Sequence, residues 1–206
     1  MRRLLSLLLA ISWCVPTSRA AIVYSGLQNI AVPFTFEGVY LDLDTSTYSL
    51  TEFAGWEINP FFAGQGIANS SNFQPVRVGT NPLDAYRAVA MGNIISASSS
   101  YFSFGEGGTD SNHIGLWSDM FHPGEDGLLG FAFTPSTGTT TFFGWMRLSL
   151  DPGNGTGVIR DWAYNSSANE GILAGLLLAA PEPGRSLILL AGIGPLVLRR
   201  RRPLPE

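Results

Sequence analysis

The chain has 206 residues, 45% of them hydrophobic and 14% charged, which suits one domain with a sizeable core. Lysine is absent, and residues 21–180 hold four arginines against fourteen acidic residues, a balance of −10. An acidic surface repels phosphate backbones, so the composition argues against nucleic-acid binding. The single cysteine, Cys14, precedes this region, which excludes disulfides and thiolate zinc sites from it.

The first twenty residues have the pattern of a secretory signal peptide. Arg2 and Arg3 precede an apolar run from Leu4 to Val15, and small residues, Ser18 and Ala20, follow it. The sequence therefore predicts export through the Sec machinery and cleavage after Ala20. An N-terminal anchor that is retained is the alternative, although the run is short for a membrane span.

Residues 21–178 have the composition of an all-β domain. Short runs rich in Val, Ile, Thr and aromatic residues alternate with Gly, Pro, Asn, Asp and Ser. We predict an antiparallel, jelly-roll-like β-sandwich. The expected strands are Ala21–Tyr24, Phe34–Leu43, Thr47–Ala54, Val76–Gly79, Asn93–Ser96, Leu128–Thr134, Thr139–Leu150 and Val158–Tyr164.

The clearest strand pair is Thr139–Leu150 with Val158–Tyr164, joined by the turn-forming DPGNGTG. Met146, Leu148 and Leu150 alternate with more polar positions, which predicts one buried face.

The segment NPLDAYRAVA predicts one short helix, with Asn81 as N-cap, Pro82 at the first position and Asp84 in the first turn. Residues 171–180 are expected to form a last strand and a linker.

Two groups of residues offer metal ligands, although no metal site or cofactor is predicted. Asp42, Asp44 and Ser46 occupy positions 1, 3 and 5 of a calcium loop, but Thr47 and Phe53 replace the glycine and glutamate that an EF-hand requires. The wet face of an edge strand is the favoured interpretation of these acids. The second group comprises His113, His122, Asp110, Asp119, Glu125 and Asp126. Their spacing matches no metal motif, so we interpret them as residues of a polar loop.

No catalytic motif occurs, so no enzyme activity is predicted. Trp56, Trp117 and Tyr101 lie beside Gly, Asn or Ser, where aromatic rings can stack on sugars, although core positions are commoner for such residues. A carbohydrate-binding module is therefore the first alternative function. A hydrolase of matrix glycans, acting through paired carboxylates, is the second.

The C-terminal segment, residues 179–206, has three parts in a fixed order. A Pro-Glu-Pro triplet precedes the apolar run Ser186–Leu198, which spans about 20 Å as a helix, short of a hydrocarbon core of roughly 30 Å. Four arginines follow, on the side that the positive-inside rule makes cytoplasmic. The candidate sorting residues are Pro181, Glu182, Pro183, Arg199, Arg200, Arg201 and Arg202.

This tail resembles the PEP-CTERM sorting signal of Gram-negative bacteria, and Gly115–Gly175, with its GFAF, GW and WAY segments, resembles the body of many proteins that carry it. The resemblance implies recognition by a membrane-embedded exosortase, transient anchoring in the inner membrane, and then release or transfer to the cell surface. It implies no activity for the β-domain. We expect a structural or adhesive role in an exopolysaccharide-rich envelope or matrix.

Overall fold

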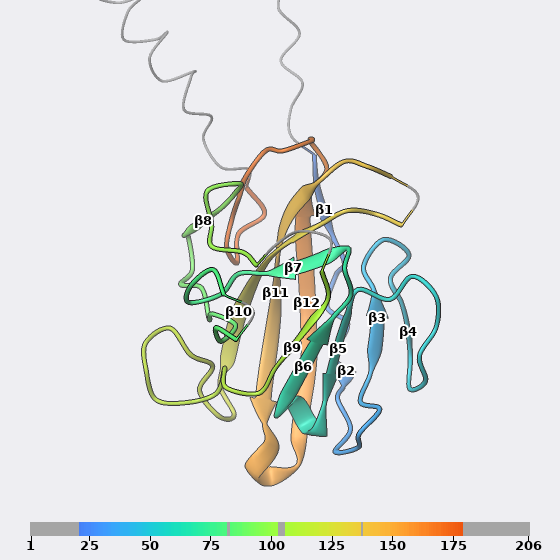
Figure 1. Ribbon diagram of the computed structural model, residues 1–206, viewed down its shortest axis with the longest axis vertical. Helices are drawn as coiled ribbons and strands as arrows, with labels where there is room; N and C mark the ends of the chain where they lie inside the picture. The colour runs from blue at the N-terminus through green and yellow to red at the C-terminus, as the bar shows by residue number, and fades with distance from the viewer. Residues whose placement is uncertain (1–20, 82, 103–105, 137, 179–206) are drawn as a thin grey trace, which may run out of the picture.

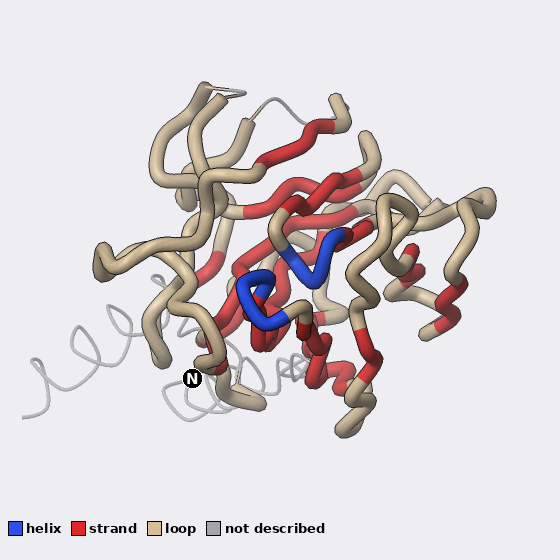
Figure 2. Tube along the Cα trace, turned by 90° about the horizontal axis from the view of Figure 1, so that it is seen from below, coloured by secondary structure: helices blue, strands red, loops and turns tan. Residues whose placement is uncertain are grey.

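A computed structural model describes residues 21–178 except 82, 103–105 and 137, and in this part the protein is mostly β-structure in antiparallel sheets (Figures 1 and 2). The helical parts of the described residues are two single turns of 3₁₀-helix, η1 (Phe62–Gly64) and η2 (Pro152–Asn154). The all-β prediction is confirmed.

The larger sheet is built on one long hairpin. In spatial order it contains β1 (Ile22–Tyr24), β12 (Thr156–Asn165), β11 (Phe142–Asp151), β10 (Asp126–Phe133) and β7 (Phe73–Pro75), with β2 (Ile30–Ala31) also paired to β12. The hairpin of β11 and β12 confirms the pair expected from the sequence.

The second sheet has five strands, and a small third sheet has two. The five-stranded sheet runs β4 (Thr47–Ser49), β3 (Tyr40–Asp42), β5 (Ile58–Phe61), β6 (Gly66–Asn69) and β9 (Gly108–Asp110). The small sheet pairs β8 (Ile94–Ile95) with β13 (Ile172–Leu173).

Both larger sheets contribute side chains to one hydrophobic core. Leu41 and Ile58 from the five-stranded sheet join Phe131, Met146 and Trp162 from the larger sheet in a single buried cluster. Met146, Leu148 and Leu150 are fully buried, as the period of two predicts. Burial of this apolar surface is the main force holding the domain together.

The opposite face of β11 is covered as well. Trp145 packs in a second cluster with Ile95 and Ile172 of the small sheet, and its indole nitrogen donates to the carbonyl of Leu176 at 3.1 Å. A Cβ at Gly144 would overlap the Phe131 ring, so glycine there permits close packing. The GW and WAY segments therefore have structural roles in the core.

A β-bulge on β12 aligns an ion pair across the hairpin. Arg147 pairs with Asp161 whereas Leu148 pairs with Ile159, so Arg160 is the extra residue. The Arg147 Nε donates to Asp161 Oδ1 at 2.9 Å, and the Tyr24 hydroxyl donates to the other carboxylate oxygen at 2.8 Å. Asp161 thereby ties β1, β11 and β12 together.

The expected helix over residues 81–90 is wrong. The Asp84 carboxylate accepts a hydrogen bond from the Asn81 amide at 2.7 Å, which closes a turn, and Tyr86 and Ala88 form isolated bridges to Arg77 and Leu129. The local helix propensity of this segment is weaker than the stabilisation it gains by pairing with extended segments elsewhere in the chain.

Other strand boundaries moved. Val76–Gly79 is not a strand, since β7 ends at Pro75, and only the last part of Phe34–Leu43 is a strand. The sequence also missed β2, β5, β6, β7 and β9.

Candidate cation-binding site

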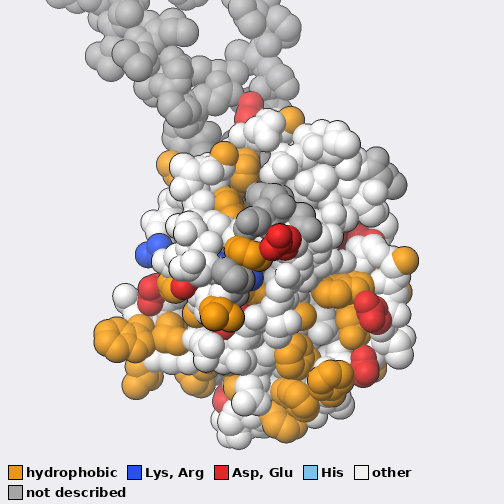
Figure 3. Space-filling view, in the orientation of Figure 1, with side chains coloured by type: hydrophobic (Ala, Val, Ile, Leu, Met, Phe, Trp, Pro, Cys, Tyr) orange, Lys and Arg blue, Asp and Glu red, His pale blue; other side chains and the backbone are white. Residues whose placement is uncertain are grey.

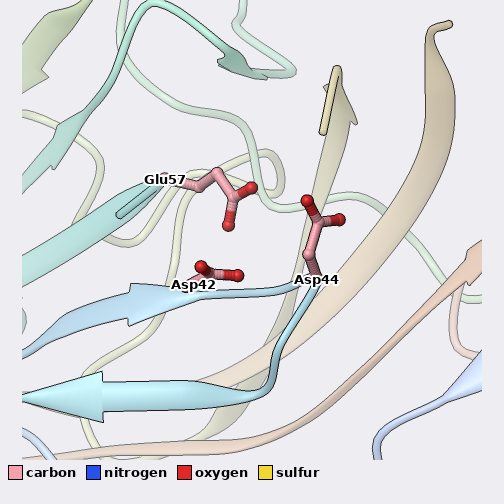
Figure 4. Close-up of side chains that lie close together, drawn as sticks. All are labelled: Asp42, Asp44 and Glu57. Carbon is pink, nitrogen blue, oxygen red and sulfur yellow. The ribbon is translucent and has the colours of Figure 1, made fainter. Parts of the chain in front are cut away.

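Three carboxylates converge where β3 ends and β5 begins. The register pairs Leu41 with Ile58, so Asp42, the last residue of β3, lies across from Glu57, which directly precedes β5. After β3 the chain turns at once, and the Thr45 amide donates to Asp42 Oδ1 at 2.9 Å. This turn brings Asp44 back toward the other two acids (Figure 4).

The three side chains are close enough to share one ion. One carboxylate oxygen from each of Asp42, Asp44 and Glu57 lies within 4.8 Å of the others. Asp42 is 8% exposed and Glu57 only 1%, whereas Asp44 is partly exposed. Among the described residues no arginine or histidine forms an ion pair with any of the three.

Glu57 is the most strongly perturbed acid. Its pKa is raised from 4.5 to about 8, mainly by burial and to a smaller extent by the charges of Asp42 and Asp44, while a hydrogen bond from the Leu43 amide at 2.5 Å opposes the rise. Burial and the Asp42 charge also raise the pKa of Asp44, against a backbone hydrogen bond from Ser136.

The carboxylates also affect the pKa of a tyrosine in the larger sheet. Burial first, and then the charges of Asp44 and Glu57, raise the pKa of the Tyr164 hydroxyl on β12. Three carboxylates crowded together in a partly dry site repel one another when ionised. A bound cation would relieve that repulsion.

The donor set suits a hard divalent cation. All three ligands are carboxylate oxygens, which Ca²⁺ prefers and which Mg²⁺ and Mn²⁺ also accept. Structural zinc sites instead draw mainly on histidine nitrogen and cysteine sulfur. Three carboxylates leave coordination positions for water or backbone oxygens, so the arrangement could hold Ca²⁺ and stabilise the junction of β3 and β5.

The sequence placed Asp42 and Asp44 in a calcium-loop pattern but favoured the wet face of an edge strand. That interpretation is wrong, because Asp42 is buried and β3 lies between β4 and β5. Glu57 was missed because it directly precedes a different strand, β5. Its signal was weak: a single glutamate beside Trp56 and ahead of the apolar Ile58. Only the pairing of β3 with β5 brings it to the other acids.

The fold places the two histidines of the second candidate metal group in different surroundings. His113 is fully buried, with Nδ1 at 3.1 Å from Asp110 Oδ2 and Nε2 at 2.8 Å from the Gly64 carbonyl oxygen. Burial acts to raise the pKa of Asp110, but hydrogen bonds from His113, the Tyr86 amide and the Asn112 amide outweigh it and lower that pKa. This pair joins β9 to η1.

His122 lies elsewhere and is partly exposed, with Nδ1 at 3.5 Å from Glu125 Oε2. Together with Glu125 and Asp126 it lines a cavity of about 330 Å³ beside Trp145 and Arg147. Asp119 contributes its backbone carbonyl, which accepts from the Ala88 amide at 2.9 Å, so the six residues considered as one metal group in the sequence serve different parts of the fold.

The three aromatic candidates also separate. Trp117 is 77% exposed, and Trp56 is half-buried beside a shallow groove. Tyr101 stacks on Phe143, and its hydroxyl donates to the Ser96 carbonyl at 3.0 Å, which marks it as structural.

Ala20 and all seven sorting-motif residues lie outside the described residues.

No protein-family model, no curated protein and no solved structure matches this chain. Within the described residues no helix has the length and apolar character that crossing a membrane requires; the tail expected to do so lies outside them.

Proposed function

We propose that this chain is an exported protein that a PEP-CTERM and exosortase system sorts to the cell surface or extracellular matrix, where it has a structural or adhesive role. The observation that carries the proposal is where the β-domain begins and ends. Ser166 donates to the carbonyl of Ala21 at 2.9 Å, and Leu173 donates to the carbonyl of Leu178 at 3.1 Å. The chain enters and leaves at the same end of the domain (Figure 1).

This geometry suits a domain held by its tail. The first described strand, β1, begins at Ile22, directly after the predicted cleavage site at Ala20. Since the last described residues lie at the same end, a tail from Pro181 to Arg202 would tether the domain by that end. The Sec machinery would export the chain, and the membrane contact would be transient.

The opposite end of the domain would then face outward. β1 pairs with the last residues of β12, whereas η2 precedes the first, so about 33 Å of strand separates the two ends. At the η2 end, η1 contacts η2, and Phe61 and Phe62 contact Phe34 and Phe36. Figure 3 shows hydrophobic side chains gathered at this lower end.

These rings form an apolar surface suited to adhesion. Phe36 is 73% exposed and Phe34 is 55% exposed. The neighbouring Phe62, partly buried, and Ala63, fully buried, have positive φ angles of 47° and 55°, which residues other than glycine rarely adopt. Two large rings left in water, at Phe34 and Phe36, favour a contact role over a purely structural one.

For the β-domain we propose a jelly-roll-like sandwich of the two larger sheets. The support is their shared core and their antiparallel pairing throughout. The proposed role is structural or adhesive rather than catalytic, and nucleic acid is not among the proposed partners.

The sorting proposal is tested with the full chain and with a variant lacking residues 181–206, each expressed in bacteria with and without an exosortase. We expect surface delivery and a loss of C-terminal mass only for the full chain in the exosortase-positive strain. Mass spectrometry and fractionation measure both. A surface-released protein with an intact C-terminus would overturn the proposal.

A further inference from the structure

A shallow groove of about 450 Å³ lies on the five-stranded sheet side of the protein. One wall is the β4–β5 connection, which contributes Glu52, Gly55 and Trp56, and the other contributes Ser70 and Asn72 from the β6–β7 turn. The groove thus combines one large aromatic ring with several polar side chains.

The Trp56 ring is held in place before any ligand arrives. Its indole nitrogen donates to Glu52 Oε1 at 3.0 Å. The Tyr40 ring meets it edge-on, with centroids 5.3 Å apart and an interplanar angle of 76°, and the Tyr40 hydroxyl donates in turn to Glu37 Oε2 at 3.1 Å. An aromatic face fixed in this way loses little conformational entropy when a ligand stacks on it.

The polar groups of the groove have unused hydrogen-bonding capacity. Glu52 Oε1 accepts the indole hydrogen, while Oε2 accepts no hydrogen bond from a described residue. The Ser70 hydroxyl, which is buried beneath the groove surface, is without a hydrogen-bond partner among the described residues. Asn72 is exposed, and its side-chain amide offers both donors and an acceptor.

The charge of the groove restricts which class of ligand can bind there. None of the described residues lining it is basic. The carboxylate cluster is adjacent, because a Cβ on Gly55 would lie 3.5 Å from Asp42 Oδ2. A ligand with carboxylate or sulfate groups would be repelled by this surface, whereas a neutral ligand with many hydroxyls would not.

We propose that this groove binds a neutral hexose unit of a polysaccharide. The apolar C–H face of the sugar stacks on Trp56, and its hydroxyls donate to Glu52 and exchange hydrogen bonds with Asn72. The inference rests on the adhesive role proposed above and adds to it a second surface, separate from the phenylalanine cluster, with a named ligand class. It needs neither the sorting tail nor a bound cation.

The test uses the exported protein with its tail, purified in detergent and run through native gels containing neutral polysaccharides (β-glucan, glucomannan, galactomannan) or acidic ones (alginate, polygalacturonate). We expect retardation in at least one neutral gel and in no acidic gel. Trp56→Ala should abolish it, and Glu52→Ala should weaken binding about tenfold through loss of a charge-assisted hydrogen bond. Trp117→Ala, a matched change of an exposed tryptophan outside the groove, should leave binding unchanged.

Glu52 is exposed, so its variant separates lost binding from lost folding, and thermal unfolding of each variant confirms the distinction. Several results would overturn the proposal: no retardation in any neutral gel, retardation confined to acidic gels, or equal binding by wild type and Trp56→Ala. Failed tail processing with intact glycan binding would instead contradict only the sorting proposal.

Discussion

Replacement of Trp162 by alanine is expected to lower the free energy of unfolding by about 3–5 kcal/mol, because it empties a large site in the core. Trp162 is 1% exposed and is the largest fully buried side chain of the described residues. It packs from β12 against the cluster shared by both larger sheets. Since small domains are stable by only about 5–15 kcal/mol, this loss would remove a large fraction of the total stability.

Chemical denaturation followed by circular dichroism measures this loss. The matched control is Trp117→Ala, which removes the same side chain from an exposed position and should change stability by no more than about 0.5 kcal/mol. Trp162→Phe should fall between the two. Equal stabilities for Trp162→Ala and Trp117→Ala would show that the shared core is not organised as described.

Without a divalent cation, the free energy of unfolding is expected to fall as the pH rises from 4.5 to about 8. These limits are the ordinary pKa of Glu57 and its raised pKa in the folded chain. The unfolded chain releases the Glu57 proton near the lower value, whereas the folded chain holds it to the upper one. The unfolded state therefore binds fewer protons in this interval, and stability declines by up to about 1.4 kcal/mol per pH unit. Asp44, with its raised pKa, acts in the same direction.

Calcium should reverse this decline. At pH 8 a concentration one hundred times the dissociation constant would stabilise the fold by about 2.7 kcal/mol, and EDTA should remove the gain. Thermal unfolding at several pH values, with Ca²⁺ or EDTA, measures both effects.

Glu57→Gln keeps an acceptor for the Leu43 amide and removes the charge. This variant should lose most of the pH slope and of the calcium effect. Glu125→Gln, at an exposed carboxylate outside the cluster, should retain both. An undiminished calcium effect in Glu57→Gln would contradict the site.

The hairpin of β11 and β12 was predictable because its information is local. Met146, Leu148 and Leu150 alternate with period two, and the turn between the strands is marked by proline and glycines. The missed strand β5 shows the opposite case: it contains Pro60 and pairs on one side with the equally short β6, so neither period nor composition marks it. The expected helix failed because tertiary bridges at Tyr86 and Ala88 outweighed a weak local signal.

The candidate sites divide in the same way. The pair Asp42 and Asp44 is visible in the sequence because the two residues lie two positions apart. Glu57 joins them only through a strand pairing that no local pattern encodes. Likewise, Trp56 and Trp117 look alike in sequence, but only Trp56 has a carboxylate holding its indole and a groove beside it.

By itself, the sequence determined the all-β class of this protein, the main hairpin and the prediction of two terminal segments for export and sorting, because these depend on composition and on residues close together along the chain. Tertiary structure alone decided which acids converge, which histidine is buried and which tryptophan borders a groove. Those outcomes depend on pairing between distant strands, where burial and close packing, rather than local propensity, set the geometry.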